Sequence, residues 1–239
     1  IITIGVINVV DSLIAKEVDC GVYCNAGKEV GVASTKAFTS QVVCLSMISI
    51  WFASLQKIND NKRAQMIRDL HNLSSDIKAT LDECREKMEE IANKYTANNM
   101  FILGKGSDEY IAKEGALKIK EISYIHTEGY SASSLKHGPF ALLDKEFPVI
   151  VLNLETIHRN KIINCCQEIS SRDAPILLIT NDNTVSAELS CDTVLIPENK
   201  TYSSLLGIIP LQLLAYYLSV KRGINPDKPK NLAKVVTVE

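Results

Sequence analysis

Four short runs of almost purely apolar residues alternate with helix-like segments in the second half of the chain. The runs are NMFILG at 99–104, FPVIVLN at 147–153, APILLIT at 174–180 and DTVLI at 192–196. Strands that are apolar on both faces are typical of a parallel sheet that helices cover on each side. The sequence therefore predicts an α/β fold, a parallel sheet flanked by helices.

Segments with helical spacing fill the stretches between these runs. We expect helices at 105–124, around 158–170 and at 203–223. The last of the three is strongly apolar and carries Pro210 inside it.

The first part of the chain resembles the end of a second domain of the same kind. Strand-like, helix-like and strand-like segments follow one another at 2–7, 11–19 and 21–24. A glycine-rich loop then leads into a long apolar helix, which Ser34 or Thr35 would cap and which we expect to be buried. The charged helical pattern of 59–95 predicts an antiparallel helical connector between the two parts.

Charge and hydropathy exclude several classes of protein. The chain has 26 basic and 28 acidic side chains and a formal charge of -2, so no basic field is available for nucleic acid. The longest apolar run, 42–55, is shorter than the ~20 residues of a membrane span, and we expect no membrane segment. The first residues lack the basic start of a signal peptide.

The seven cysteines do not have the spacing of a zinc site. We expect free thiols in a reducing cytoplasm, with no metal and no cofactor. The chain begins on a strand-like run and without Met, which predicts that it is cut from a longer protein.

The GKG turn at 104–106 stands between a predicted strand and a predicted helix, where a phosphate loop could lie. The third glycine of a dinucleotide fingerprint is absent, so a simple tight turn is the better interpretation.

The helix that follows carries Glu114, Lys118 and Glu121 on one face, because they are four and then three residues apart. A solvated stripe of ion pairs fits this pattern. A carboxylate base held beside an ammonium group also fits it, and that arrangement suits proton transfer next to a carbonyl.

Two further side chains have both a structural and a chemical interpretation. His137 lies in SLKHGPF, where a Gly-Pro turn could direct its near-neutral imidazole or simply pack it. Lys234 lies in the apolar tail NLAKVVTVE, either as a surface lysine or as an amine carried into a pocket, where burial would make it a carbonyl nucleophile.

Three stretches together closely resemble one enzyme family. They are NAGKEVGVASTKAFTSQ at 25–41, EGALKIKEISYIHTEGYSASSLKHGP at 114–139, and PLQLLAYYLSVKRG at 210–223 with NLAKVVTVE at 231–239. They look like the isomerase half of glutamine–fructose-6-phosphate aminotransferase, which contains two sugar-isomerase (SIS) domains. The resemblance runs through the whole chain and implies one partial and one complete SIS domain.

The resemblance divides the chain into four segments. Residues 1–58 would be the C-terminal part of the first SIS domain and 59–96 a helical connector. Residues 97–225 would be the second SIS domain, and 226–239 a tail that completes the sugar site.

The family's chemistry converts fructose 6-phosphate and glutamine-derived ammonia into glucosamine 6-phosphate, the first step toward amino-sugar nucleotides. By resemblance, Glu121 moves a proton between C1 and C2, with Lys118 assisting it. Lys234 forms a Schiff base at C2, and His137 opens the sugar ring. The resemblance also implies a homodimer in which His137 reaches the neighbouring subunit's site.

Three more positions match residues that line the family's sugar pocket, namely Val32, Ser34 and Ala233. The family's phosphate-binding run, of the kind S-G-E-T, does not occur here, nor does its N-terminal cysteine nucleophile. We expect both upstream of Ile1, the cysteine in a glutaminase domain, and we expect this piece alone to be impaired or inactive.

Three rival interpretations remain. The chain could belong to another SIS enzyme, such as a phosphosugar isomerase or a fructosamine-6-phosphate deglycase. It could be a non-catalytic module that binds sugar phosphates, or a purely structural fragment. The tail NLAKVVTVE argues against a different SIS enzyme.

Overall fold

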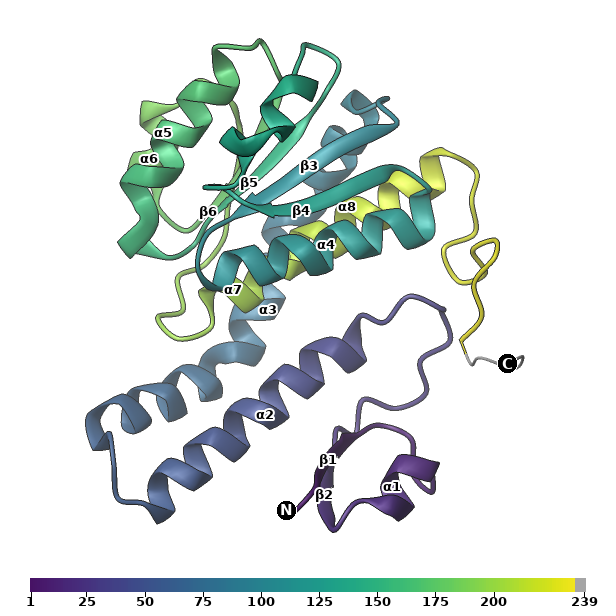
Figure 1. The fold of residues 1–239 in the computed structure, drawn as a ribbon, viewed down its shortest axis with the longest axis vertical. Helices are drawn as coiled ribbons and strands as arrows, with labels where there is room; N and C mark the ends of the chain where they lie inside the picture. The colour runs from purple at the N-terminus through teal and green to yellow at the C-terminus, as the bar shows by residue number, and fades with distance from the viewer. Residues whose placement is uncertain (235–239) are drawn as a thin grey trace.

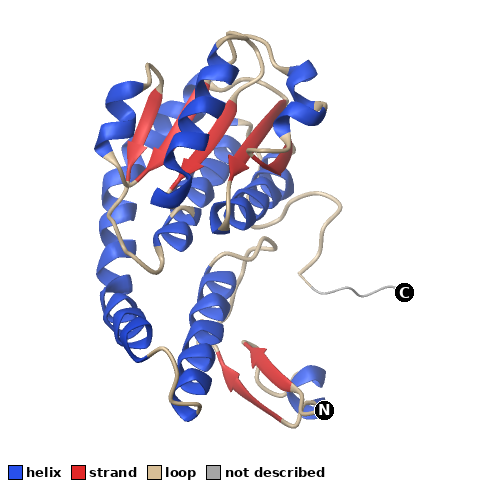
Figure 2. Cartoon of the chain, turned by 60° about the vertical axis from the view of Figure 1, so that its left-hand side comes forward, coloured by secondary structure: helices blue, strands red, loops and turns tan. Residues whose placement is uncertain are grey.

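Five parallel strands form the main sheet, in the order β4-β3-β5-β6-β7. The strands are β3 (Asn99–Gly104), β4 (His126–Ser131), β5 (Val149–Asn153), β6 (Ile176–Thr180) and β7 (Asp192–Leu195). The computed structural model describes residues 1–234, and helices lie on both sides of the sheet (Figures 1 and 2). The predicted α/β fold, with a parallel sheet flanked by helices, is confirmed.

Alternate residues of the central strands enter two different cores. One face, with Ile102 and Ile150, packs against three helices, and the other, with Phe101 and Val149, packs mainly against a fourth. The three are α3 (Asp60–Lys94), α4 (Ser107–Ser123) and α8 (Ile208–Lys221), and the fourth is α5 (Arg159–Ser170). Because both faces are buried, these strands are apolar at nearly every position, and the buried polar exceptions Asn153 and Thr180 stand at the C-terminal ends of β5 and β6.

Strand β4 does not belong to the apolar runs from which the sheet is predicted. Its sequence, HTEGYS, is polar, and only Thr127 is buried, because β4 is an edge strand with one neighbour. A Cβ on Gly129 would meet the Cα atom of Lys113 at 2.5 Å, so glycine lets α4 lie directly on this strand.

The predicted helix at 203–223 is two helices that meet at Gly207. They are α7 (Ser203–Leu206) and α8. Pro210 is the third residue of α8, so it lies in the first turn and not in the interior. The backbone N–H that proline lacks has no intrahelical partner in that turn, and proline is tolerated there.

The N-terminal part contains a two-stranded parallel sheet of β1 (Ile4–Ile7) and β2 (Cys20–Tyr23), joined through α1 (Leu13–Glu17). The apolar helix α2 (Lys36–Leu55) follows, and the prediction that it is buried is wrong. Ala37 is its only buried residue among the described residues, because the rest of the structure packs against part of its surface only.

The segment predicted as an antiparallel helical connector is one continuous helix, α3. Its second half packs on α8 and buries Cys84, Met88 and Ile91 in the main core. The division into four segments stays a prediction, and residues 235–239 of the tail segment lie outside the described part of the chain.

Short helices complete the second layer and the connections. They are α6 (Asn183–Glu188) and the 3-10 turns η1 (Leu135–His137), η2 (Pro139–Leu142) and η3 (Thr156–His158).

Among residues 1–234, two helical stretches are apolar and long enough to cross a membrane, α2 and 203–221. The second is 67% buried inside the protein, as a core helix is. Apolar length alone is weak evidence for a membrane span, so the predicted absence of membrane segments stays a prediction.

Candidate active site

Lys118 lies on the inner face of α4 between two carboxylates. Its Nζ atom is 2.7 Å from Glu121 Oε2 and 3.4 Å from Glu114 Oε1. Lys118 is only 3% exposed, so the interpretation of this face as a solvated stripe is wrong for the lysine. A buried ammonium requires compensating charge, which the two glutamates supply from one turn away on either side.

Glu121 keeps one carboxylate oxygen without a hydrogen-bond donor. Its Oε2 atom is shielded from solvent, and its contact with Lys118 has the distance of an ion pair but not the alignment of a hydrogen bond. The oxygen therefore combines a nearby positive charge with an unused acceptor position.

The glycine-rich loop before α2 contacts the C-terminal tail through Lys234. The Lys234 Nζ atom donates to Glu29 Oε2 at 2.7 Å and to the Val32 carbonyl oxygen at 3.3 Å. Burial alone would raise the pKa of Glu29, but the hydrogen bonds from Lys234 and from the Thr35 and Ala37 amides outweigh it. The pKa of Glu29 lies below its usual range as a result.

The same tail also contacts the end of α4. The Lys230 backbone N–H donates to the Tyr124 hydroxyl oxygen at 2.6 Å, and the Lys230 ammonium lies 4.5 Å from the centre of the Tyr124 ring. Tyr124 is three residues beyond Glu121. Figure 1 shows the tail running from α8 to the loop before α2, so it joins this loop to the last turn of α4.

The other predicted pocket residues are close in the chain to these contacts. Ser34 is half-buried in the same loop as Val32. Ala233 is exposed and directly precedes Lys234. The structure thus brings Val32 and Lys234 into contact and leaves Ser34 and Ala233 next to them in the chain.

His137 lies elsewhere, exposed in η1 after the C-terminal end of β4. Glu121 lies two residues before the end of α4, and the chain enters β4 only five residues later. A six-residue strand is about 20 Å long, so β4 separates His137 from Glu121 of the same chain.

The GKG segment is a tight turn. Gly106 has a φ of +68°, which favours glycine. The first amide of α4, from Ser107, donates to Glu155 Oε1 at 3.2 Å. A carboxylate of the protein itself therefore occupies the start of α4, where a phosphate would otherwise be held.

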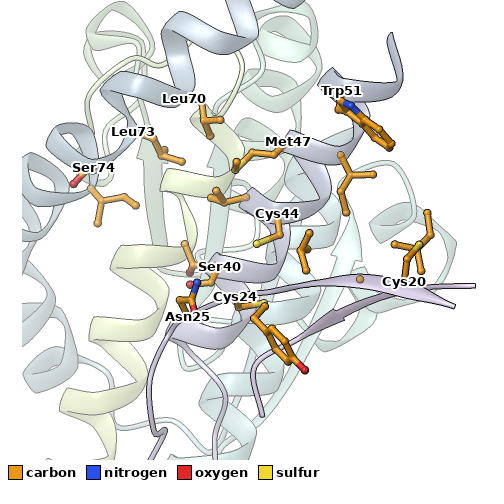
Figure 3. Close-up of a pocket in the computed structure, with 18 residues that line it drawn as sticks. Cys20, Cys24, Asn25, Ser40, Cys44, Met47, Trp51, Leu70, Leu73 and Ser74 are labelled. Atoms are coloured by element: carbon orange, nitrogen blue, oxygen red, sulfur yellow. The ribbon is translucent and has the colours of Figure 1, made fainter. Parts of the chain in front are cut away.

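A larger groove, with a volume of about 1010 Å³, lies away from these residues between β2, α2 and α3. Figure 3 shows its mostly apolar lining, with Met47 of α2 extending toward Leu70 of α3. It contains none of the predicted site residues and little that could act on a polar substrate. We therefore place the candidate site at the tail and not in this groove.

No cluster of three or more potential metal ligands is present within residues 1–234, and the cysteines are free thiols. Sequence reasoning missed Glu29 and Tyr124. Glu29 is an acidic residue in a loop with Gly27 and Gly31, which is the one local sign of a special role.

Comparisons with known proteins extend these observations. The SIS domain family matches residues 95–222. Human glutamine–fructose-6-phosphate aminotransferase (isomerizing) 2 is 43% identical over 100% of this chain and 35% of its own length. The glutamine–fructose-6-phosphate aminotransferase (isomerizing) of Chlorobaculum tepidum is 42% identical over 98% of this chain and 39% of its own length.

A solved structure has the same fold over nearly the whole chain. It is the C-terminal domain of glucosamine-fructose-6-phosphate aminotransferase from Francisella tularensis, with a TM-score of 0.89 and 32% identity. The match covers 95% of this chain and 65% of that one. The chain thus spans well under half the length of the curated relatives.

Proposed function

The chain belongs to the SIS domain family, and from this we propose that it carries the sugar-isomerising site of a glutamine–fructose-6-phosphate aminotransferase. The substrate is fructose 6-phosphate and the product is glucosamine 6-phosphate. The relatives that match the chain from end to end bear this enzyme's name and support the proposal.

The observation that carries the proposal is the docking of the tail. Lys234 contacts the Val32 carbonyl oxygen, while Lys230 contacts Tyr124 just beyond the Lys118–Glu121 pair. The tail thus carries a primary amine and packs against the end of the helix that bears a carboxylate base, and these two groups are the minimum needed for imine formation followed by proton transfer.

Lys234 acts on the C2 carbonyl of the open-chain sugar. Its nitrogen forms a C–N bond, and the carbonyl oxygen leaves as water, so C2 becomes an imine carbon that ammonia can attack. Val32, Ser34 and Ala233 line the sugar around this nitrogen.

Glu121 moves the proton from C1 to C2, which converts the ketose skeleton to the aldose skeleton. The Glu121 side chain is 22% exposed, so its carboxylate is accessible from outside the core while Lys118 holds the Oε2 atom. One carboxylate can serve both carbons because they are adjacent. Lys118 assists by holding this carboxylate and balancing its charge.

His137 opens the sugar ring in the neighbouring subunit of a homodimer. Its separation from Glu121 along β4 supports a shared site, because one chain cannot bring both to the same sugar.

The remaining parts of the proposal concern the whole protein. Ammonia is supplied from glutamine by a glutaminase domain upstream of this chain, and the product enters amino-sugar nucleotide synthesis in the cytoplasm. The length of the relatives leaves room for such a domain, since the chain covers 35% of the human protein.

The proposal is tested with the protein expressed from its full-length gene, supplied with fructose 6-phosphate and ammonium chloride. We expect glucosamine 6-phosphate, measured by mass spectrometry, and a loss of about 10²- to 10⁴-fold in Glu121→Gln because the proton-transfer base is removed. Glu86→Gln, a change of an exposed acid on α3, is the matched control and should leave the rate unchanged.

Other products would contradict the proposal and indicate a rival. Aldose phosphate without nitrogen would indicate a phosphosugar isomerase. Consumption of fructosamine 6-phosphate in place of fructose 6-phosphate would indicate a deglycase. A Glu121→Gln variant with normal activity would exclude the role of this base.

A further inference from the structure

We propose that Glu29 is the positioning residue for Lys234, and that its two carboxylate oxygens have separate tasks. One oxygen fixes Glu29 to the start of α2, and the other holds the ammonium of the tail lysine. This inference rests on the proposed function, because it assigns a partner to the amine that forms the imine.

Glu29 Oε1 is bound to the first turn of α2. It accepts the backbone N–H of Thr35 at 2.9 Å and that of Ala37 at 3.3 Å. Thr35 occupies the cap position but makes no capping bond with its own side chain. Glu29 therefore satisfies amides that a helix of 20 residues leaves open at its positive end, and its side chain is fixed by the backbone.

Glu29 Oε2 is left free to face the tail. It accepts from Lys234 Nζ at 2.7 Å, and the Val32 carbonyl oxygen is the second acceptor at 3.3 Å. Two acceptors from one loop determine where the nitrogen lies. The side chain of Glu29 is 10% exposed and that of Lys234 is 37% exposed, so the rigid partner is the acid.

Glu29 serves as an anchor and not as a base. Its hydrogen bonds keep its pKa below the usual range of a glutamate, against the opposing effect of burial. Such a carboxylate stays ionised near neutral pH and does not readily take the proton of the lysine.

The charge on the nitrogen is the same before and after imine formation, which suits a fixed anion. The ammonium reacts overall with the C2 carbonyl to give a protonated imine and water. A C–N bond forms, the C–O bond breaks, and two protons leave the nitrogen with the oxygen. The nitrogen is positively charged both as the ammonium and as the protonated imine, so Glu29 can form an ion pair with it in both states.

Glu29→Gln separates the two tasks, since glutamine keeps one oxygen for the α2 amides and presents an NH₂ donor to Lys234. In the full-length protein, the Schiff base with fructose 6-phosphate is trapped with borohydride and counted by intact mass. We expect roughly tenfold less adduct at subsaturating sugar, because a charge-assisted bond is lost. The matched control is Glu17→Gln, which changes an exposed acid on α1. This variant should give the same amount of trapped Schiff base as the native protein.

A second measurement does not depend on activity. Hydrogen exchange of residues 225–234 should quicken equally in Glu29→Gln, in Lys234→Met and in the double variant, because all three break the same contact. Lys234 lies in an exposed tail, so Lys234→Met tests the pair even if changes at Glu29 disturb the fold. The amides of Thr35 and Ala37 should stay protected in Lys234→Met.

The results separate the anchor from the proposed function. The proposed role of Glu29 would be contradicted if Glu29→Gln traps the normal amount of Schiff base. It would also be contradicted if the effects of the two changes on hydrogen exchange add up in the double variant. If the native protein traps no sugar while the exchange pattern holds, Glu29 still binds Lys234 and the proposed function fails.

Discussion

Lys118 and Glu29 are two charged residues that the fold uses in different ways. Lys118 is buried in α4, where Glu114 and Glu121 offset the cost of placing its charge away from water. Glu29 is held mainly by backbone amides at the start of α2 and meets its lysine at the surface. Charge in the first case compensates a buried ammonium, and in the second it joins the tail to the loop before α2.

The contact between Glu29 and Lys234 should depend on pH only in the acid range. Because the pKa of Glu29 is lowered in the folded protein, its contribution is complete above the ordinary glutamate pKa of about 4.3 and is lost as pH falls through the lower folded value. Asp227, whose carboxylate lies next to Gly31, is another acidic side chain close to this contact.

We therefore expect the tail to stay docked at pH 5 and to open below about pH 4. The measurement is hydrogen exchange of residues 225–234, corrected for the pH dependence of the intrinsic rate. Glu29→Gln should show no such step. Opening of the native tail near pH 6 would contradict this assignment.

At the scale of the elements, α4 is held by the edge strand on one side and by α8 on the other. Gly129 allows the close approach of α4 to β4, and Gly115 allows the approach of Leu211 from α8. The carboxylate–lysine pair therefore lies on a helix whose position two neighbours determine.

Gly129→Ala should move α4 away from β4. The added Cβ would meet the Lys113 Cα and N atoms at 2.5 and 2.6 Å, and backbone atoms cannot give way as a side-chain end can. We expect a loss of about 1–3 kcal/mol in the free energy of unfolding, measured by urea denaturation. An unchanged midpoint would show that the two elements are not in direct contact.

Leu214→Ala should destabilise the main core, because Leu214 of α8 is 0% exposed. A Leu→Ala change at such a site costs about 2–5 kcal/mol, and thermal unfolding should occur at a lower temperature. Val220→Ala is the matched control on the same helix, since Val220 is 50% exposed and its loss leaves little cavity. Equal effects of the two changes would contradict the assignment of α8 to the core.

On the scale of the whole molecule, the candidate site gathers segments that are far apart in sequence. Lys234 meets Glu29 across 205 positions, while His137 and Glu121, only 16 positions apart in number, lie at opposite ends of β4. Distance along the chain therefore says little about which residues act together. The arrangement calls for a second subunit if His137 is to reach the sugar.

Mixed dimers test this arrangement. Full-length His137→Ala and Glu121→Gln proteins should each be inactive and should recover activity after subunit exchange, because each mixed dimer contains one intact site. Random exchange makes half of the dimers mixed, so the expected recovery is about one quarter of the native rate. Absence of recovery, with exchange proved by mass spectrometry, would exclude the shared site.

Much of the architecture follows from local sequence patterns. The apolar runs at 99–104, 147–153 and 174–180 predict buried parallel strands because both of their faces have to avoid water. The same logic misses β4, since a polar edge strand carries no such pattern. It also predicts wrongly that α2 is buried, because an apolar helix has the same sequence pattern whether or not other segments cover it.

Local sequence patterns are enough to predict the fold class and to single out residues suited to proton transfer and carbonyl chemistry, among them Lys118, Glu121 and Lys234. The burial of Lys118, the contact of Glu29 with Lys234 and the separation of His137 from Glu121 become visible only in the folded chain. The physical reason is that spacing along a helix or strand is a local property. Burial and pairing depend on contacts between segments that local patterns do not encode.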